Sequence, residues 1–429
     1  LSAVATNNSG FMFVGLIGTT YTEGLSSVWL MVGWIFGDYL AWLSGVPEKL
    51  RRRSEEIGAA SIPSFLGRGL VGGRMVTITG GVITLVFLGV YAAAQLTAGS
   101  KALHVLFGWN YQVGAILGAL IVVAYCFAGG IRASIWTDAV QSVVMIVAMV
   151  GLFVLALGET GGFSGMWSKL EAIDPNLVMT FPQNLPWGLG LFLLGWLAAG
   201  LGVVGQPHVM IRAMTLDDPN NANRARRIYI TWYVLFAVAA IGVGLASRVL
   251  LPAAGGFDPE LAMPMLAQQL LPAVWVGFVL AGLFAAIMST ADSQLLSCSA
   301  AITQDIFPRF AQNYRVVKLT TMLITMLMLG VALMGGSVFN LVVLAWSALA
   351  SGLGPLLLVR VFGKDVSGKV GITMMLVGVV AVLVWRYALG FSGAVYEVLP
   401  GMTSGFLVYF VSTKIQKQQP SQSMLNSLP

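Results

Sequence analysis

Hydroxyl and carboxylate side chains gather in one short apolar segment of the chain, residues 285–294. If this segment is helical, four of its residues form one stripe, because side chains three or four positions apart share a helix face. They are Ala286, Ser289, Thr290 and Ser293, with Asp292 on the flank. Oxygen atoms of these kinds can replace the hydration shell of a small hard cation. The structural alternative is that each hydroxyl bonds back to the carbonyl four residues earlier, without a ligand.

Two further segments contain residues that disfavour a continuous helix. Residues 5–10, Ala-Thr-Asn-Asn-Ser-Gly, place four polar side chains before a glycine and suit an unwound turn, or else a frayed chain end. Residues 200–208, Gly-Leu-Gly-Val-Val-Gly-Gln-Pro-His, contain three glycines and a proline. Such a sequence weakens a helix and frees carbonyl groups. The alternative for the glycines is close helix packing.

Isolated ionisable residues also occur inside apolar runs. Asp138 follows Trp-Thr at the start of one run, where either a helix dipole or a functional role could stabilise its carboxylate. Asp38 lies in another run, and the sequence gives it no specific role. The two histidines and two cysteines are far apart, which leaves no set of ligands for zinc, haem or an iron–sulfur cluster. We therefore expect neither a cofactor nor an enzyme.

The composition requires lipid as the main solvent of this protein. Of 429 residues, 57% are hydrophobic and 9% are charged, whereas an ordinary soluble domain has about 25% charged residues. Net charge is +6, but its placement in loops between apolar runs points to membrane topology and gives no reason to expect a nucleic-acid partner. We expect an integral membrane protein whose partners include the lipid bilayer.

Twelve apolar runs are long enough to cross a hydrocarbon core of about 30 Å. Backbone groups in lipid must be satisfied within a segment, and the runs lack the alternation of a barrel, so the predicted fold is an all-α bundle. The runs lie at approximately 1–20, 25–45, 73–100, 110–130, 132–157, 184–211, 228–251, 271–302, 317–335, 338–360, 370–390 and 396–413.

Basic residues predict the orientation of these spans. Short cytoplasmic loops carry an excess of Lys and Arg. With twelve spans, one side receives 19 of the 23 basic residues, Arg212 among them. The opposite side receives Lys101, Lys169, Arg248 and Arg386. The 46–72 loop and the C-terminus are thus predicted to be cytoplasmic.

The interrupted runs 1 and 6 head two successive sets of five runs. Interrupted segments at corresponding positions of two halves indicate an inverted-repeat transporter. The predicted transporter domain covers residues 1–413, with repeat one at about 1–157, repeat two at about 184–360 and two extra helices at 370–413. Residues 414–429 are predicted to form a polar cytoplasmic tail. The chain opens inside an apolar run without a basic segment before it, so we expect an upstream part that is absent and no visible signal peptide.

The segments Ala-Thr-Asn-Asn-Ser-Gly, Trp-Thr-Asp, Gly-Gln-Pro-His and Ala-Ile-Met-Ser-Thr together resemble the sodium/solute symporter family. The resemblance extends along essentially the whole chain, to the segment Tyr-Glu-Val-Leu-Pro-Gly at residues 396–401. It implies ten core helices in a five-plus-five inverted repeat of the leucine-transporter type. It also implies two further helices after this core and one before it.

The resemblance also implies how cations are held. A sodium ion lies between core helices 1 and 8 in that family. Here its ligands would be the carbonyls of Ala5, Asn8 and Ala286 and the hydroxyls of Ser289 and Thr290. Some members hold a second sodium, for which the corresponding residues are Asp138, Ser289, Asp292 and Ser293.

The expected solute site lies at the two interruptions, and it departs from the family member that the chain most resembles. That member has an aspartate at the position of Asn7 and a small hydroxyl residue at Asp292. Two large-to-small changes, at Ala199 and Val203, predict a roomier or differently shaped pocket. The candidate solute-binding residues are Asn7, Ser9, Phe11, Tyr91, Ala199, Val203, Gln206 and Pro207.

The resulting hypothesis is a sodium-coupled symporter of the bacterial cytoplasmic (inner) membrane, importing a small organic solute by alternating access. The resemblance suggests an amino acid such as proline, or a carboxylate. Three alternatives stay open at this point. They are a proton-coupled carrier of the same fold, a symporter-like sensor module of a larger signalling protein, and a passive channel, which the paired interruptions disfavour.

Overall fold

The structure of the protein is a computed structural model that describes residues 1–128, 130–251 and 256–418. Within these ranges every regular element is helical. Nine helical stretches in the described ranges are long and apolar enough to cross a membrane. They are Gly73–Phe107, Ile131–Thr160, Gly188–Gly205, Pro219–Leu250, Ala273–Ile306, Tyr314–Leu333, Val338–Val361, Gly368–Ala388 and Val398–Ile415. The prediction of an all-helical membrane protein is confirmed.

The other three predicted spans also fall on helices, which are shorter or interrupted. The first covers α1 (Ser2–Asn7) and α2 (Leu16–Glu23), the second matches α3 (Val28–Leu43), and the fourth matches α7 (Tyr111–Ala128). The longest helix, α6 (Gly73–Phe107), has 35 residues. At about 1.5 Å per residue it is roughly 52 Å long and extends well beyond the hydrocarbon core.

Several predicted loops contain helices of their own. The 46–72 loop holds α4 (Val46–Glu56) and α5 (Ile62–Gly67), and the later loops hold α9 (Gly162–Ile173) and α13 (Ala262–Leu270). Helix α4 follows a left-handed glycine and has a proline at its start, which suits a helix N-terminus. Its apolar residues are buried and its charged ones are exposed or half-buried, so a loop-like composition forms an amphipathic helix.

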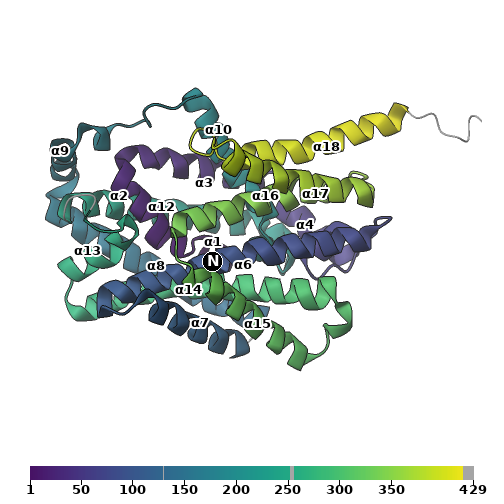
Figure 1. Cartoon of the computed structure of the whole chain (residues 1–429), viewed down its shortest axis with the longest axis horizontal. Coiled ribbons are helices and arrows are strands. Elements are labelled where there is room, and N and C mark those ends of the chain that lie inside the picture. The colour runs from purple at the N-terminus through teal and green to yellow at the C-terminus, as the bar shows by residue number, and fades with distance from the viewer. Residues whose placement is uncertain (129, 252–255, 419–429) are drawn as a thin grey trace, which may run out of the picture.

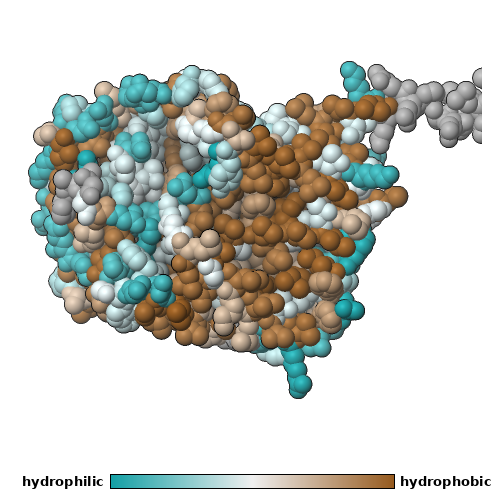
Figure 2. Space-filling model, in the orientation of Figure 1, coloured by the Kyte–Doolittle hydropathy of each residue, from teal (hydrophilic) through white to brown (hydrophobic). Residues whose placement is uncertain are grey.

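The spanning helices run along the long axis of the molecule (Figure 1). Helices α9 and α13 lie at one end, which we call the α9 end, and α4 lies at the other, the α4 end. Figure 2 shows a broad hydrophobic surface over the middle of the molecule, with hydrophilic residues gathered at the α9 end and along the edge of the α4 end. This is the surface pattern of a protein that lies across a bilayer.

The remaining spans are α8 (Ile131–Thr160), α12 (Ala222–Leu250), α14 (Ala273–Ala300), α15 (Tyr314–Leu333), α16 (Val338–Val361), α17 (Gly368–Leu383) and α18 (Val398–Gln418). Helix α18 continues past residue 413, so the predicted polar tail begins inside a helix. The rest of that tail, residues 419–429, lies outside the described residues.

Glycines bring α3 against α10 (Gly188–Leu201), the first part of the interrupted sixth span. A Cβ atom on Gly200 would lie 1.9 Å from the carbonyl oxygen of Trp34 and 2.5 Å from the backbone nitrogen of Asp38. Only glycine allows the two backbones to approach this closely. Close packing therefore explains this glycine, and the interruption begins further along.

Candidate functional site

The first predicted interruption lies inside the folded core. Helix α1 ends at Asn7, and Asn8 has non-helical dihedral angles of φ −91° and ψ 67°. Helical structure then resumes as a π-helical turn, η1 (Phe11–Gly15), which leads into α2. Asn8 and Ser9 are fully buried. A frayed chain end would be exposed, so the prediction of an internal break is confirmed.

The second interruption is also present. Helix α10 ends at Leu201, a 3-10 turn η4 (Gly202–Gly205) follows, and Gln206 is extended before α11 (Pro207–Met214) begins. The side chain of Trp346 donates from Nε1 to the carbonyl oxygen of Ala199 over 2.8 Å, and Gln206 Nε2 donates to the carbonyl oxygen of Trp346 over 3.1 Å. Helix α16 is thus hydrogen-bonded to residues on both sides of the break.

Three of the five predicted sodium ligands meet between α1 and α14. The hydroxyl of Ser289 lies 3.2 Å from the carbonyl oxygen of Ala5 and 3.1 Å from that of Ala286. All three residues are fully buried. Three oxygens from two different helices therefore converge in the interior, as a cation site requires.

The other two predicted ligands lie beside this group of oxygens. Thr290 Oγ1 donates to the carbonyl oxygen of Thr6 over 3.0 Å, which ties α14 to the end of α1. Asn8 donates from Nδ2 to the carbonyl oxygen of Val4 over 3.0 Å, and its buried Oδ1 has no hydrogen-bond partner. The structural alternative for the hydroxyls therefore holds in part. Thr290 bonds across to α1, and Ser289 bonds both across to α1 and back to Ala286. Ser293 donates back to the carbonyl oxygen of Ser289 over 2.6 Å.

The four residues predicted to hold a second cation each contact another partner in this structure. Asp138 and Ser293 are joined by the guanidinium of Arg212, which donates to Asp138 Oδ2 over 2.8 Å and contacts Ser293 Oγ. Ser289 faces Ala5. Asp292 accepts a contact from the thiol of Cys126 over 3.1 Å. The guanidinium of Arg212 thus contacts two of the four residues that were predicted to bind a second cation.

Arg212 corrects two predictions from the sequence. Counting loop charges placed it in a cytoplasmic loop, but it lies in the last turn of α11 and is 7% exposed. The dipole explanation for Asp138 is replaced by this ion pair, because Asp138 is seven residues into α8. Ser2 completes the cluster by donating to Asp138 Oδ2 over 2.7 Å and accepting from Arg212 Nε over 2.8 Å.

The predicted solute residues form two connected groups. In the first, Ser9 and Tyr91 share a hydrogen bond of 3.3 Å between hydroxyls, and the Tyr91 ring packs edge-on against His208 at 5.5 Å. The second joins Ala199 and Gln206 through Trp346. Aromatic contacts link the two, because Phe11 packs on Trp34 at 5.7 Å and Trp34 packs on Trp346 at 4.9 Å.

The remaining solute candidates are also buried. Asn7, Val203 and Pro207 lie in the interior, and the carbonyl oxygen of Val203 accepts from the backbone nitrogen of Gln206 over 3.0 Å. Both polar atoms of the Asn7 side chain have no hydrogen-bond partner. A buried polar group without a partner costs about 1–3 kcal/mol, so this amide is available to a ligand.

Further buried polar groups around the two interruptions were missed from the sequence. Gln95 Oε1 accepts from the backbone nitrogen of Gly10 over 2.8 Å, while its Nε2 has no partner. Both ring nitrogens of His208 and both amide atoms of Gln294 are buried and unpartnered as well. Gln95 is a single polar residue in an apolar run, whereas His208 and Gln294 end the segments 200–208 and 285–294. Asking which helix faces carry polar groups at membrane depth could have identified them.

A cavity of about 220 Å³ approaches the site from the α4 end. Its lining includes Arg212 and Ser293 of the ion-pair cluster, Pro207 at the start of α11, and Thr84 of α6. The cavity therefore reaches both the charged cluster and the second interruption.

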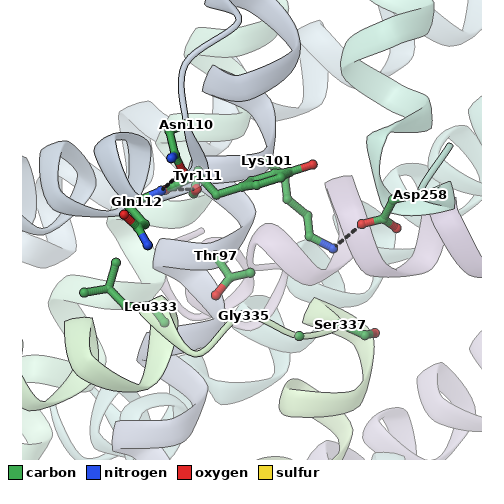
Figure 3. A pocket seen from close by; sticks show the side chains of 12 residues that line it. Thr97, Lys101, Asn110, Tyr111, Gln112, Asp258, Leu333, Gly335 and Ser337 are labelled. Carbon is green, nitrogen blue, oxygen red and sulfur yellow. Dashed lines mark hydrogen bonds and ion pairs between the residues drawn. The ribbon is translucent and has the colours of Figure 1, made fainter.

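A second cavity, of about 530 Å³, opens at the α9 end (Figure 3). Lys101 lies at its wall and donates to Asp258 over 2.7 Å and to Glu260 over 2.5 Å. Glu260 also accepts from the backbone nitrogens of Val338 and Phe339 over 2.9 Å, at the start of α16. Lys101, which the charge count placed in a loop, is a buried residue of α6 that ties it to α16 at this end.

Two broken helices, a converging set of oxygens and a cavity at each end define a membrane carrier of small solutes. A profile of the sodium:solute symporter family matches residues 1–378. The chain belongs to the sodium:solute symporter family. It is a sodium-coupled transporter of a small solute and not an enzyme.

Similar proteins agree with this classification. The high-affinity proline transporter PutP of Bacillus subtilis is 32% identical, over 99% of this chain and 91% of its own length. The sodium/proline symporter of Escherichia coli is 31% identical, over 99% and 86%. A solved Na⁺-coupled sialic acid symporter, in a substrate-bound outward-open state, has a TM-score of 0.77 at 21% identity, covering 96% of this chain and 88% of that one. These matches favour symport over a sensor module, a channel or a proton-coupled carrier.

Proposed function

We propose that one sodium ion binds between α1 and α14 and drives the uptake of a small amino acid at the two interruptions. The observation that carries the proposal is the convergence of the Ser289 hydroxyl with the carbonyls of Ala5 and Ala286, within 3.2 Å. The carbonyl of Asn8 and the hydroxyl of Thr290 would complete the oxygen shell. Sodium bound here would hold the broken first helix against α14 and so favour one arrangement of the solute site.

The ion pair between Arg212 and Asp138 supports a stoichiometry of one sodium. The guanidinium supplies a positive charge where a second cation would otherwise neutralise Asp138. Removing one partner from such a buried pair costs about 3–5 kcal/mol, so a sodium ion would have to displace the arginine at a high cost. One sodium moving inward gains about 2.3 kcal/mol from a potential of 100 mV.

The repeat organisation follows from the positions of the interruptions. We assign repeat one to residues 1–157, repeat two to 184–360 and the two extra helices to 370–413, which makes twelve crossings. The interrupted segments then head the two repeats, as in inverted-repeat transporters. The excess of basic residues at the α4 end supports a cytoplasmic location for that end, with the chain in a bacterial inner membrane.

The solute site lies between the breaks, where Ser9, Tyr91 and Asn7 offer neutral polar groups. Proline carriers are among the similar proteins, and an amino acid fits a pocket of hydroxyls and amides beside half-helix ends. The change to small residues at Ala199 and Val203 would admit a side chain larger than that of proline. We do not expect a nucleic-acid ligand.

The experiment is uptake into proteoliposomes with an imposed sodium or potassium gradient and a panel of labelled amino acids and carboxylates. The proposal expects sodium-dependent, saturable uptake of an amino acid. Uptake driven equally by potassium, or only by a proton gradient, would reject the cation assignment. Uptake of a carboxylate that lacks an amine would reject the solute class and leave the cation assignment intact.

A further inference from the structure

Three arginines from separate segments meet at the α4 end of the molecule. Arg53 lies in α4, Arg68 directly follows α5, and Arg360 lies in the last turn of α16. Arg53 Nη1 donates to the carbonyl oxygen of Arg360 over 3.1 Å, and Arg360 Nη2 donates to the carbonyl oxygen of Arg68. Arg68 in turn donates to the carbonyl oxygen of Ile57 over 2.8 Å. We call these three residues the arginine triad.

The triad carries uncompensated positive charge. Among the described residues, none of the three guanidinium groups forms an ion pair, whereas the neighbouring Arg51 and Arg52 are paired with Glu55 and Glu48. Their hydrogen-bond acceptors are neutral carbonyl groups. Arg360 lies within electrostatic range of Arg53, which repels it, and of Asp365, which attracts it. Three positive charges beside one carboxylate leave a net positive charge, which an anion would neutralise.

One donor atom of the triad has no hydrogen-bond partner in the described structure. Arg360 Nε is buried and has no hydrogen-bond partner. Arg53 Nη2 packs against Gly363, so that a Cβ atom added to this glycine would lie 2.3 Å from that nitrogen. The guanidinium of Arg53 is therefore seated in the turn after α16 and does not extend freely into solvent. Guanidinium groups of this kind match the oxygens of a phosphate with fork-like geometry.

The surroundings of the triad are apolar, which favours a lipid over a free anion. Phe362, two residues after Arg360, is 41% exposed, and Val71, three residues after Arg68, is 92% exposed. Lys49 adds a fourth cation, 4.1 Å from the centre of the Phe362 ring. A cationic cluster bordered by exposed apolar side chains at the end of spanning helices fits a headgroup with its acyl chains alongside.

We propose that the arginine triad binds the phosphodiester of an anionic membrane lipid. The bound lipid would bridge α4, the segment after α5 and the end of α16, and would relieve the repulsion between Arg53 and Arg360. Helix α4 also contacts the chain just after α11, through Arg51 Nε and the carbonyl oxygen of Leu216 at 2.6 Å. The lipid would thus steady the end of the molecule from which the smaller cavity opens.

The test measures lipid binding by the purified full chain with native mass spectrometry and thermal unfolding. The probes are phosphatidylglycerol, phosphatidylcholine and inorganic phosphate. We expect phosphatidylglycerol to bind and to raise the unfolding temperature, with little effect of the other two. Each triad arginine contributes about fivefold to the affinity. An equal effect of phosphatidylcholine, or an effect of inorganic phosphate as large as that of phosphatidylglycerol, would overturn the proposal.

Variants separate the triad from the general positive charge of this face. R53Q/R68Q should lose the preference for phosphatidylglycerol, and the control R52Q should keep it, because Arg52 is exposed and already paired with Glu48. R53K/R68K keeps the charge and the fold but lacks the fork geometry, and should lose part of the preference. Unchanged binding of phosphatidylglycerol by R53Q/R68Q would overturn the proposal, as would an equal loss in R52Q.

Discussion

Arg212 donates a hydrogen bond to Asp138 over 2.8 Å, and the two charged side chains are 7% and 0% exposed. A buried charge is costly unless a partner neutralises it. The ion pair therefore explains how both charged side chains can be buried. Ser2, at the start of α1, and Ser293, in α14, complete the cluster.

Replacing Arg212 with glutamine should change the sodium dependence of transport. The variant leaves Asp138 without its cation, so sodium can take the place of the guanidinium. We expect the Hill coefficient for sodium activation to rise above a parent value of about 1. The measurement is the initial rate of uptake against sodium concentration. We also expect a loss of stability of about 3–5 kcal/mol.

The double variant D138N/R212Q is the matched control for that experiment. It removes both charges, so it should recover much of the stability that R212Q loses, and it should keep a Hill coefficient near that of the parent. An R212Q variant with the sodium dependence of the parent would contradict the one-sodium account.

Ser289→Ala should weaken sodium activation far more than solute affinity at saturating sodium. Its hydroxyl lies between the carbonyls of Ala5 and Ala286 and is the ligand most directly shared by the two helices. Loss of one such ligand should raise the sodium concentration for half-maximal uptake by about tenfold. Ser297→Ala is the control, because Ser297 lies on the same helix and bonds only to the carbonyl of Ser293. Equal effects of the two variants would argue against the site.

Tyr91→Phe should raise the solute KM by about two- to tenfold with little change in sodium activation. The variant removes the hydroxyl that pairs with Ser9 at the first break, and a hydrogen bond of this kind is worth about 0.5–1.5 kcal/mol. Tyr125→Phe serves as the control, because that hydroxyl contacts Thr137 of α8. A KM unchanged in Tyr91→Phe would exclude the residue from the solute site.

Tyr229→Phe should destabilise the protein without a specific effect on sodium. Tyr229 donates to Asp38 Oδ2 over 2.6 Å, and Oδ1 of that carboxyl group has no partner. Removing the donor leaves a buried acceptor unsatisfied, at a cost of about 1–3 kcal/mol. Thermal unfolding in detergent measures the loss, with Tyr39→Phe as the control on the neighbouring position. A thermal midpoint equal to that of the parent would show that the hydrogen bond contributes nothing.

Most of the fold could be predicted from the sequence, because hydropathy and backbone satisfaction restrict a lipid-embedded chain to helices. The breaks at residues 5–10 and 200–208 were also predictable, since polar residues, glycines and proline disfavour helix at those places. The amphipathic α4 was missed because its high charge resembles that of a loop. Only tertiary packing shows that Val46 and Leu50 are buried.

The site was predicted in part. The helical stripe and the family resemblance put Ser289 forward as a sodium ligand, and the structure places it against α1. The position of Arg212 could not be found by counting loop charges. Counting basic residues near the ends of spans does not distinguish a side chain that faces water from one that is paired with a buried carboxylate. Gln95 was missed for a related reason, because a lone polar residue in an apolar run gives no hint of the partner across the bundle.

The most direct test of the sodium site is diffraction from crystals in which thallium replaces sodium, since thallium scatters anomalously and mimics an alkali cation. We predict one anomalous peak beside the Ser289 hydroxyl and the carbonyls of Ala5 and Ala286. This peak should be absent from crystals of the Ser289→Ala variant. A peak beside Asp138 instead, with none between α1 and α14, would contradict this prediction.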